Sequence, residues 1–85
     1  MGNPARRFVY VIRSTQNPQK HYVGLSADPA RRLAAHNAGL SPHTSRYRPW
    51  RLLVSIEFAD PDNALEFERY LKTGSGRAFA KRHFG

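Results

Sequence analysis

The feature that most constrains the fold is a run of β-branched and aromatic residues at positions 7–13. The run reads Arg-Phe-Val-Tyr-Val-Ile-Arg, so its apolar side chains fall on both alternating faces of an extended chain. A strand of this kind is typical of a sheet that is covered on both faces. With 85 residues the chain has room for one small domain, residues 1–85, with a thin core.

Two further runs predict strands, at residues 21–25 and 51–58, and the second of these is again apolar on both faces. The segment at residues 14–19 contains an Asn-Pro pair, which is turn chemistry. The first two strands are therefore expected to pair as an antiparallel hairpin. Gly24, inside the second strand, indicates a close approach by another backbone or by a ligand.

The first helix has clear boundary signals. Asp28 is suited to cap its N-terminus, Pro29 to fill its first position, and Gly39 to end it. The side of this helix that is predicted to face the sheet holds Ala30, Leu33, Ala34 and Asn37.

The second helix starts in the same way, at Asp60 and Pro61, and is expected to run to about Thr73. The Gly-Ser-Gly sequence at residues 74–76 is expected to break it, and residues 77–84 predict a basic terminal helix. The predicted order is β-β-α-β-α-α. It forms an α/β (α+β) fold with a three-stranded, mainly antiparallel sheet and flanking helices.

The strongest compositional signal is a formal net charge of +8, from 14 lysines and arginines against 6 acidic residues. Most of the basic residues are arginine, whose planar guanidinium matches phosphate oxygens, so DNA or RNA is the expected partner. The absence of cysteine excludes disulfides and thiolate metal sites and favours a cytoplasmic location. No apolar run approaches the roughly 20 residues of a membrane helix, and residues 1–7 lack the apolar core of a secretion signal.

Helix phase separates the two glutamates of the second helix. Ala64, Phe67 and Leu71 define its apolar stripe, and Glu68 lies within that stripe while Glu66 lies opposite. A carboxylate on the inner side of a thin domain is costly unless it is paired or binds a metal. An ion pair with one of the many arginines is the commoner of these two outcomes.

Two more pairs of polar side chains are brought together by the predicted elements. Arg32 and His36 are neighbours on the first helix, where the arginine would help to keep the imidazole neutral, unless both lie on an ordinary solvated face. Tyr10 and Tyr22 can approach across the hairpin, either as plain aromatic packing or as phenols that relay a proton. No metal-ligand spacing is found among His21, His36, His43 and His83.

These positions together resemble the GIY-YIG nuclease superfamily, over about residues 8–82. The similar features are a Val-Tyr-Val triplet around Tyr10, a Tyr-Val-Gly triplet beginning at Tyr22, Arg32 ten residues later, then His36 and Glu68. Further features resemble small stand-alone bacterial members, namely His36-Asn37, Arg48-Pro49 and the stretch Leu-Lys-Thr-Gly-Ser-Gly-Arg at residues 71–77. Val9 and Val11 replace the glycine and isoleucine that name the first motif.

The resemblance implies a site in which the tyrosines, Arg32 and Glu68 cluster, with one divalent metal, Mg²⁺ or Mn²⁺, bound through Glu68. Tyr10, or a water that it activates with help from Tyr22 and His36, would provide the attacking oxygen. Arg32 would stabilise charge on the phosphoryl oxygens, and the metal would support the leaving 3′ oxygen. The implied activity is a metal-dependent DNA endonuclease directed by structure rather than sequence, with a protein partner for targeting.

Two other interpretations stay open. The chain could be a non-catalytic nucleic-acid-binding module or a subunit that needs a partner for activity, and a ribosome-associated basic protein is supported by charge alone. Tyr47 is a candidate for stacking a base, whereas Trp50 is expected in the core. The basic residues expected to bind nucleic acid are Arg46, Arg48, Lys72, Arg77, Lys81 and Arg82.

Overall fold

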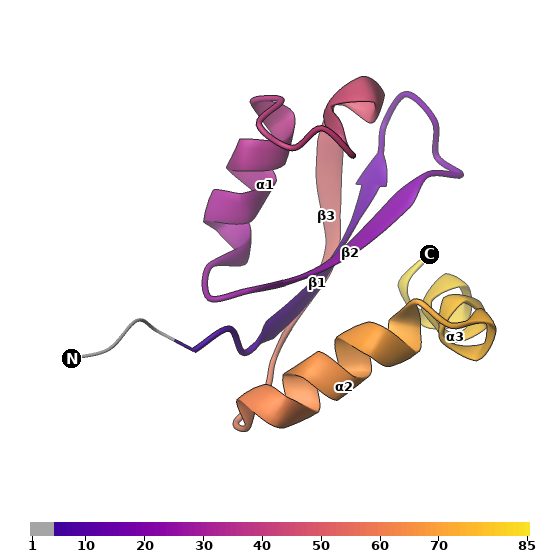
Figure 1. The fold of residues 1–85 in the computed structure, drawn as a ribbon. Coiled ribbons are helices and arrows are strands. Elements are labelled where there is room, and N and C mark those ends of the chain that lie inside the picture. The colour runs from indigo at the N-terminus through magenta and orange to yellow at the C-terminus, as the bar shows by residue number, and fades with distance from the viewer. Residues whose placement is uncertain (1–4) are drawn as a thin grey trace.

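The computed structural model describes residues 5–85 and shows an antiparallel sheet with helices on both faces (Figure 1). Strand β1 (Phe8–Ser14) lies in the centre, between β2 (His21–Ser26) and β3 (Trp50–Glu57). The predicted order β-β-α-β-α-α and the three-stranded antiparallel sheet are confirmed. The expectation that residues 1–7 lack a signal core falls partly on residues 1–4, which lie outside the described residues.

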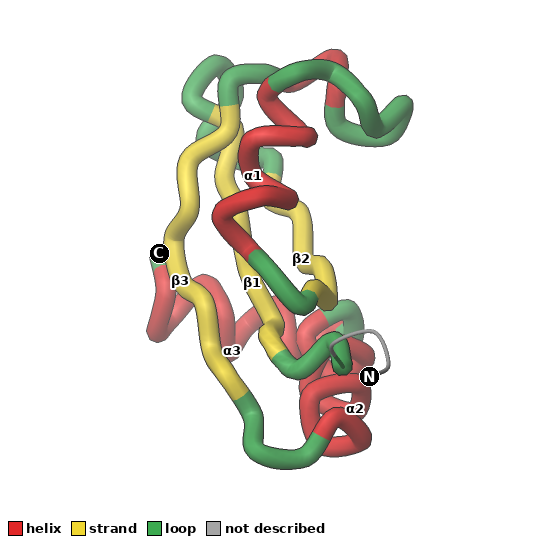
Figure 2. Tube along the Cα trace, turned by 90° about the vertical axis from the view of Figure 1, so that its left-hand side faces the viewer, coloured by secondary structure: helices red, strands yellow, loops and turns green. Residues whose placement is uncertain are grey.

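Helix α1 (Pro29–Asn37) covers one face of the sheet, and α2 (Pro61–Leu71) with α3 (Gly74–Phe84) covers the other. Figure 2 shows α1 in front of the strands and α3 behind them. A short 3-10 helix, η1 (Ser45–Tyr47), lies in the loop that leads into β3. Among residues 5–85, no helix has the length and apolar character needed to cross a membrane.

The central strand supplies the core of both layers. Val9 and Val11 pack toward α2 and α3, while Tyr10 and Ile12 pack in the cluster on the α1 side. All four side chains are nearly inaccessible to solvent. This confirms the prediction that the first strand is covered on both faces, and it follows from the two-residue period of a strand.

Both proline-containing helix starts are confirmed. The Asp28 carboxylate accepts a hydrogen bond from the Arg31 amide, and Asp60 does the same for the amide of Asp62. Gly39 follows the end of α1 with φ +79, a left-handed conformation that glycine adopts without strain.

The predicted inner face of α1 is wrong. The buried residues of this helix are Pro29 and His36, with Leu33 between them, whereas Ala30 and Ala34 are exposed. An alanine side chain is too small to fix which side of a helix faces the core. The larger Leu33 and His36 determine the face because they fill more space, and His36 has hydrogen-bond partners for its polar atoms.

The third strand begins one residue before its predicted start, at Trp50, which is buried as expected. Although β3 is apolar on both faces, most of it is only partly covered, and Leu52 is 38% exposed. The reason is topological: β3 lies at an edge of the sheet and pairs only with β1.

The predicted break between the second helix and a separate terminal helix is confirmed, but it lies at residues 72–73 and not at residues 74–76. These residues form the first turn of α3, which Thr73 caps by accepting a hydrogen bond from the Gly76 amide at 3.1 Å. Gly76 is buried, and a Cβ added there would lie 1.8 Å from the carbonyl oxygen of Tyr70. Glycine is therefore present because α3 crosses the end of α2 at very short range.

The two glycines of this turn provide a matched stability test. Gly76→Ala should lower the free energy of unfolding by about 1–3 kcal/mol, because the methyl group forces the two helices apart. Gly74→Ala should have no such cost, since no atom lies within 4 Å of its added Cβ. Urea unfolding of both variants measures the difference, and equal stabilities would contradict the close crossing of α2 and α3.

Candidate active site

A chain of buried hydrogen bonds connects the central strand to α1 and to the loop after it. The Tyr10 hydroxyl lies 2.9 Å from His36 Nε2, and His36 Nδ1 lies 2.7 Å from Thr44 Oγ1. The carbonyl oxygen of Thr44 accepts a hydrogen bond from Trp50 Nε1 at 2.9 Å. Tyr10, His36 and Thr44 are each 1% exposed, so this network is part of the core.

The position of the Tyr10 ring depends on Gly24 of the neighbouring strand. Tyr10 and Gly24 are register partners, and a Cβ added at Gly24 would lie 2.3 Å from the Tyr10 hydroxyl oxygen. The ring therefore lies across the backbone of β2, and only glycine leaves room for it. The predicted close approach at Gly24 is confirmed, but the approaching group is the side chain of Tyr10 and not the backbone or ligand that was expected.

Burial and the charge of Arg32 shift the pKa values of both Tyr10 and His36. Burial raises the pKa of the Tyr10 phenol above its ordinary value, and the nearby Arg32 guanidinium opposes this shift because it favours the phenolate. Burial, and then the positive charge of Arg32, lower the pKa of His36. The expectation that Arg32 helps to keep His36 neutral is confirmed, although His36 lies in the core and not on a solvated face.

The two hydrogen bonds of His36 are compatible with a tautomer that can accept a proton from Tyr10. If the phenol donates to Nε2, this nitrogen is the unprotonated one, and Nδ1–H then donates to Thr44 Oγ1. Such an imidazole presents a lone pair to the Tyr10 hydroxyl and can accept its proton. The Thr44 hydroxyl can accept the Nδ1–H bond of this tautomer.

The solvent-facing members of the site are Tyr22 and Arg32. Tyr22 is half-buried, and its ring centroid lies 5.0 Å from that of His36 in an edge-on arrangement and 6.4 Å from that of Tyr10. Arg32 is exposed on α1, although its charge acts on Tyr10 and His36. The structure thus brings together four of the five predicted catalytic residues.

Glu68 comes from the other helical layer, on α2. Its side chain is only 12% exposed and forms an ion pair with Lys72, one turn along the same helix. The predicted burial of Glu68 and the exposure of Glu66 are both confirmed, but the partner is a lysine and not an arginine. The charge of Lys72 also lowers the pKa of Tyr10, as the smallest of the causes that act on this phenol.

Thr44 and Asn37 hold the elements that carry the site in place, and the sequence did not predict a role in the site for either residue. Thr44 is eight positions beyond His36 in an irregular loop, so no local pattern points to its role. The side chain of Asn37 bonds both backbone polar groups of Trp50, since its Nδ2 donates to the carbonyl oxygen at 3.0 Å and its Oδ1 accepts from the amide at 2.6 Å. This pairing fixes the end of α1 against the start of β3.

The predicted nucleic-acid-binding residues are all exposed and fall into two groups. Near the end of α1, the Arg48 Nε donates to the carbonyl oxygen of Ser45 at 2.8 Å. Tyr47, the candidate for stacking a base, is half-buried. The ammonium group of Lys20 lies over its ring, with Nζ 5.1 Å from the ring centroid, and so covers part of the ring. The second group follows the end of α2 and continues along α3, and it is formed by Lys72, Arg77, Lys81 and Arg82.

A family model described as the GIY-YIG catalytic domain matches residues 6–82. The chain belongs to the GIY-YIG nuclease superfamily. The match covers all three strands, α1 and α2, and it extends to residue 82 within α3.

The curated relatives of this GIY-YIG domain include structure-specific endonuclease subunits. The protein named "Structure-specific endonuclease subunit SLX1" from Scheffersomyces stipitis is 43% identical over 67 residues, which are 71% of this chain and 20% of the relative. The homologue named slx1 from Talaromyces marneffei is 41% identical over 71 residues, covering 76% of this chain and 18% of the relative. An SLX1 homologue from Giardia intestinalis is 37% identical over 65 residues, covering 72% and 18%.

The GIY-YIG chain therefore spans about a fifth of the length of the curated relatives that it matches. These three relatives are eukaryotic, so the likeness to bacterial stand-alone members stays a prediction. No solved structure matches the chain.

The lowered pKa of His36 predicts how stability depends on pH. Below about pH 6.5 the unfolded chain binds a proton on His36 that the folded chain excludes. The free energy of unfolding should therefore decrease as the pH falls from about 6.5 toward the lowered pKa, by about 1.4 kcal/mol for each unit of difference.

Urea unfolding between about pH 5 and pH 8 measures this dependence. His36→Gln should remove this component, whereas the exposed His43→Gln should keep the wild-type profile. Parallel profiles for the wild type and His36→Gln would contradict a neutral, buried His36.

Proposed function

We propose that this GIY-YIG domain is the catalytic part of a metal-dependent DNA endonuclease that recognises the structure of its substrate. The observation that carries the proposal is the buried chain Tyr10–His36–Thr44, which ends beside the cationic side chain of Arg32. A proton acceptor behind a phenol, with an arginine at the solvent side, suits the attack of an oxygen on a phosphodiester. The names of the matched relatives support the substrate class.

The Tyr10 hydroxyl acts as the first proton acceptor in this proposal. As the attacking water gives a proton to the Tyr10 oxygen, the phenolic proton passes to His36 Nε2, 2.9 Å away. This transfer avoids a free phenolate, which the burial of Tyr10 makes costly. The imidazolium that forms keeps its Nδ1–H bond to Thr44.

The water oxygen then forms a bond to phosphorus while the bond from phosphorus to the 3′ oxygen breaks. Arg32 stabilises the negative charge that develops on the non-bridging oxygens, and a proton from solvent neutralises the leaving oxygen. Arg32 is exposed on α1 and acts on the buried Tyr10 phenol, so in this proposal its side chain faces both the phosphate and the phenol. Tyr22 is placed to orient the attacking water, since it is the more accessible of the two tyrosines.

The donor set suits a divalent cation of the Mg²⁺ type. Among residues 5–85 no cluster of three or more histidine and carboxylate ligands occurs, so one carboxylate, Glu68, would hold the ion with waters and a substrate phosphate. When bound, the cation supplies Lewis-acid stabilisation of the leaving 3′ oxygen. In the structure the Glu68 carboxylate forms an ion pair with Lys72. The Lys72 side chain is 52% exposed, so it can turn toward solvent and leave the carboxylate free to bind the cation.

A protein partner is part of the proposal. The matched relatives are named subunits, and the matched segment covers only about a fifth of their length. A catalytic domain with so small a surface gains substrate selection from other protein segments. A binding module without catalysis is the competing function, and it predicts salt-dependent DNA binding with no hydrolysis in any metal.

The first activity test compares the two glutamates of α2. With Mg²⁺ or Mn²⁺ and a panel of branched, flapped and single-stranded DNA, Glu68→Gln and Arg32→Ala should each reduce the cleavage rate by at least about 100-fold. Glu66→Gln, on the exposed side of the same helix, should cleave at the wild-type rate. Equal cleavage by the wild type and both site variants would show a contaminating nuclease and would refute the proposal.

The second test concerns the hydroxyl of Thr44. Thr44→Val removes the partner of His36 Nδ1, whereas Thr44→Ser keeps it. We expect Thr44→Val to lower the cleavage rate by about 10–100-fold and to change its pH profile, and Thr44→Ser to restore both. A uniform loss in both variants with an unchanged pH profile would indicate that Thr44 serves only the fold.

A further inference from the structure

A groove of about 800 Å³ runs between the β1–β2 hairpin and α3. It lies on the side of the sheet opposite α1, so it is separate from the Tyr10–His36–Thr44 chain. The apolar side chains that line it come from all three strands and from α2 and α3, and they are Val11, Val23, Leu53, Leu71, Ala80 and Phe84. A concave, largely apolar surface of this size can take up part of a ligand.

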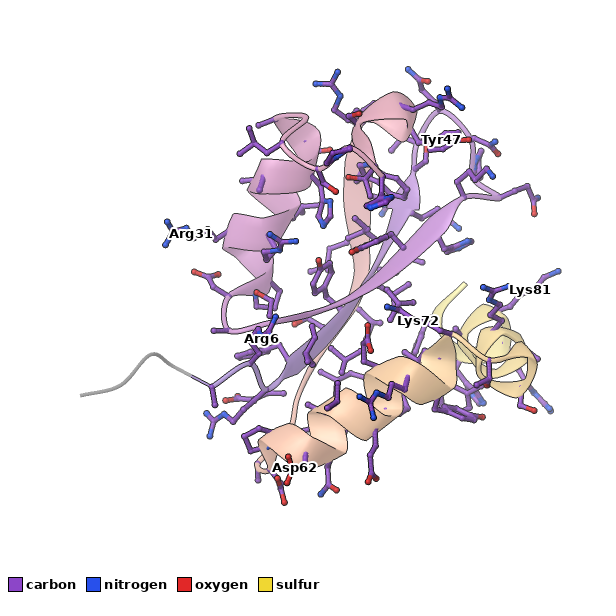
Figure 3. The ribbon with its side chains drawn as sticks, viewed as in Figure 1. Arg6, Arg31, Tyr47, Asp62, Lys72 and Lys81 are labelled. Carbon is purple, nitrogen blue, oxygen red and sulfur yellow. The ribbon has the colours of Figure 1, made fainter. Side chains whose placement is uncertain are left out.

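Cationic side chains surround this apolar floor. Lys20 and Arg13 contribute from the hairpin, and Lys72, Arg77 and Lys81 contribute from the ends of α2 and α3. Among the described residues that line the groove, none is acidic. Figure 3 shows Lys72 and Lys81 at the end of the molecule where α2 meets α3. The groove therefore combines a positive rim with an apolar interior.

We propose that this groove binds an unpaired DNA strand next to the scissile bond. The phosphates contact the cationic rim, and one or more bases enter the apolar floor, where Tyr22 and Phe84 offer ring faces or edges. Bases in a duplex are stacked and paired, so a duplex has phosphates for the rim but no free base faces for the floor. The chemistry of the groove thus favours a single strand.

Two residues connect the groove to the candidate active site. Tyr22 lines the groove and also contacts His36 with its ring. Lys72 lines the groove and also forms the ion pair with Glu68. A strand that leaves the site beside Glu68 would enter the groove directly. The statement that the groove lies next to the scissile bond rests on the proposed nuclease function. The statement that the groove binds a single strand does not depend on that function.

The test measures binding without cleavage. In EDTA, the affinities for a fluorescent oligothymidylate and for a duplex of equal length are compared by anisotropy at several salt concentrations. Lys20→Glu and Lys81→Glu, from opposite walls, should each weaken single-strand binding at least fivefold and lower the salt slope by about 0.7. Duplex binding, which can use the rim but not the apolar floor, should weaken by a clearly smaller factor.

Arg69→Glu is the matched control, because it makes the same change of charge at an exposed position of α2 that does not line the groove. It should change single-strand affinity by less than twofold, and thermal unfolding should show that all three variants are folded. The proposal is overturned if the groove variants behave like Arg69→Glu, or if they weaken duplex binding equally. The two proposals can also fail separately. If the groove variants weaken single-strand binding as expected but the protein shows no Mg²⁺-dependent cleavage, the nuclease proposal is overturned and the groove proposal stands.

Discussion

The packing of the Tyr10 ring across the backbone of Gly24 is the constraint on which the rest of the site depends. It requires a glycine on the edge strand, because any Cβ at that position would overlap the phenol. It also places the hydroxyl against His36, whose ring is held from behind by Thr44. The loop that carries Thr44 is in turn fixed by Trp50, so a polar chain of three residues is part of the hydrophobic core.

The proposed site draws on both helical layers of a thin sheet. α1 contributes Arg32 and His36 from one face, and α2 contributes Glu68 from the other. Because β2 is an edge strand, its free side is open to side chains from either layer. The charge of Lys72, the ion-pair partner of Glu68, also lowers the pKa of Tyr10 slightly, as the smallest of the causes that act on it.

Local signals predicted most of the fold. Capping aspartates before prolines gave the starts of α1 and α2, and helix phase alone identified Glu68 as a carboxylate on the inner side. The errors arose where two elements meet. Small alanines did not reveal the inner face of α1, and the glycines at residues 74–76 begin α3 because Gly76 lies against the backbone of Tyr70.

The sequence by itself determined the order of the elements, the positive charge and the types of residue available for chemistry, because these follow from local periodicity and composition. Only the tertiary structure decided the environment of each group. The low exposure of Tyr10, the lowered pKa of His36 and the role of Thr44 all depend on contacts between residues far apart in the chain. Desolvation and hydrogen bonding depend on which atoms are close in space. Local sequence patterns do not show which distant residues exclude water from a given side chain.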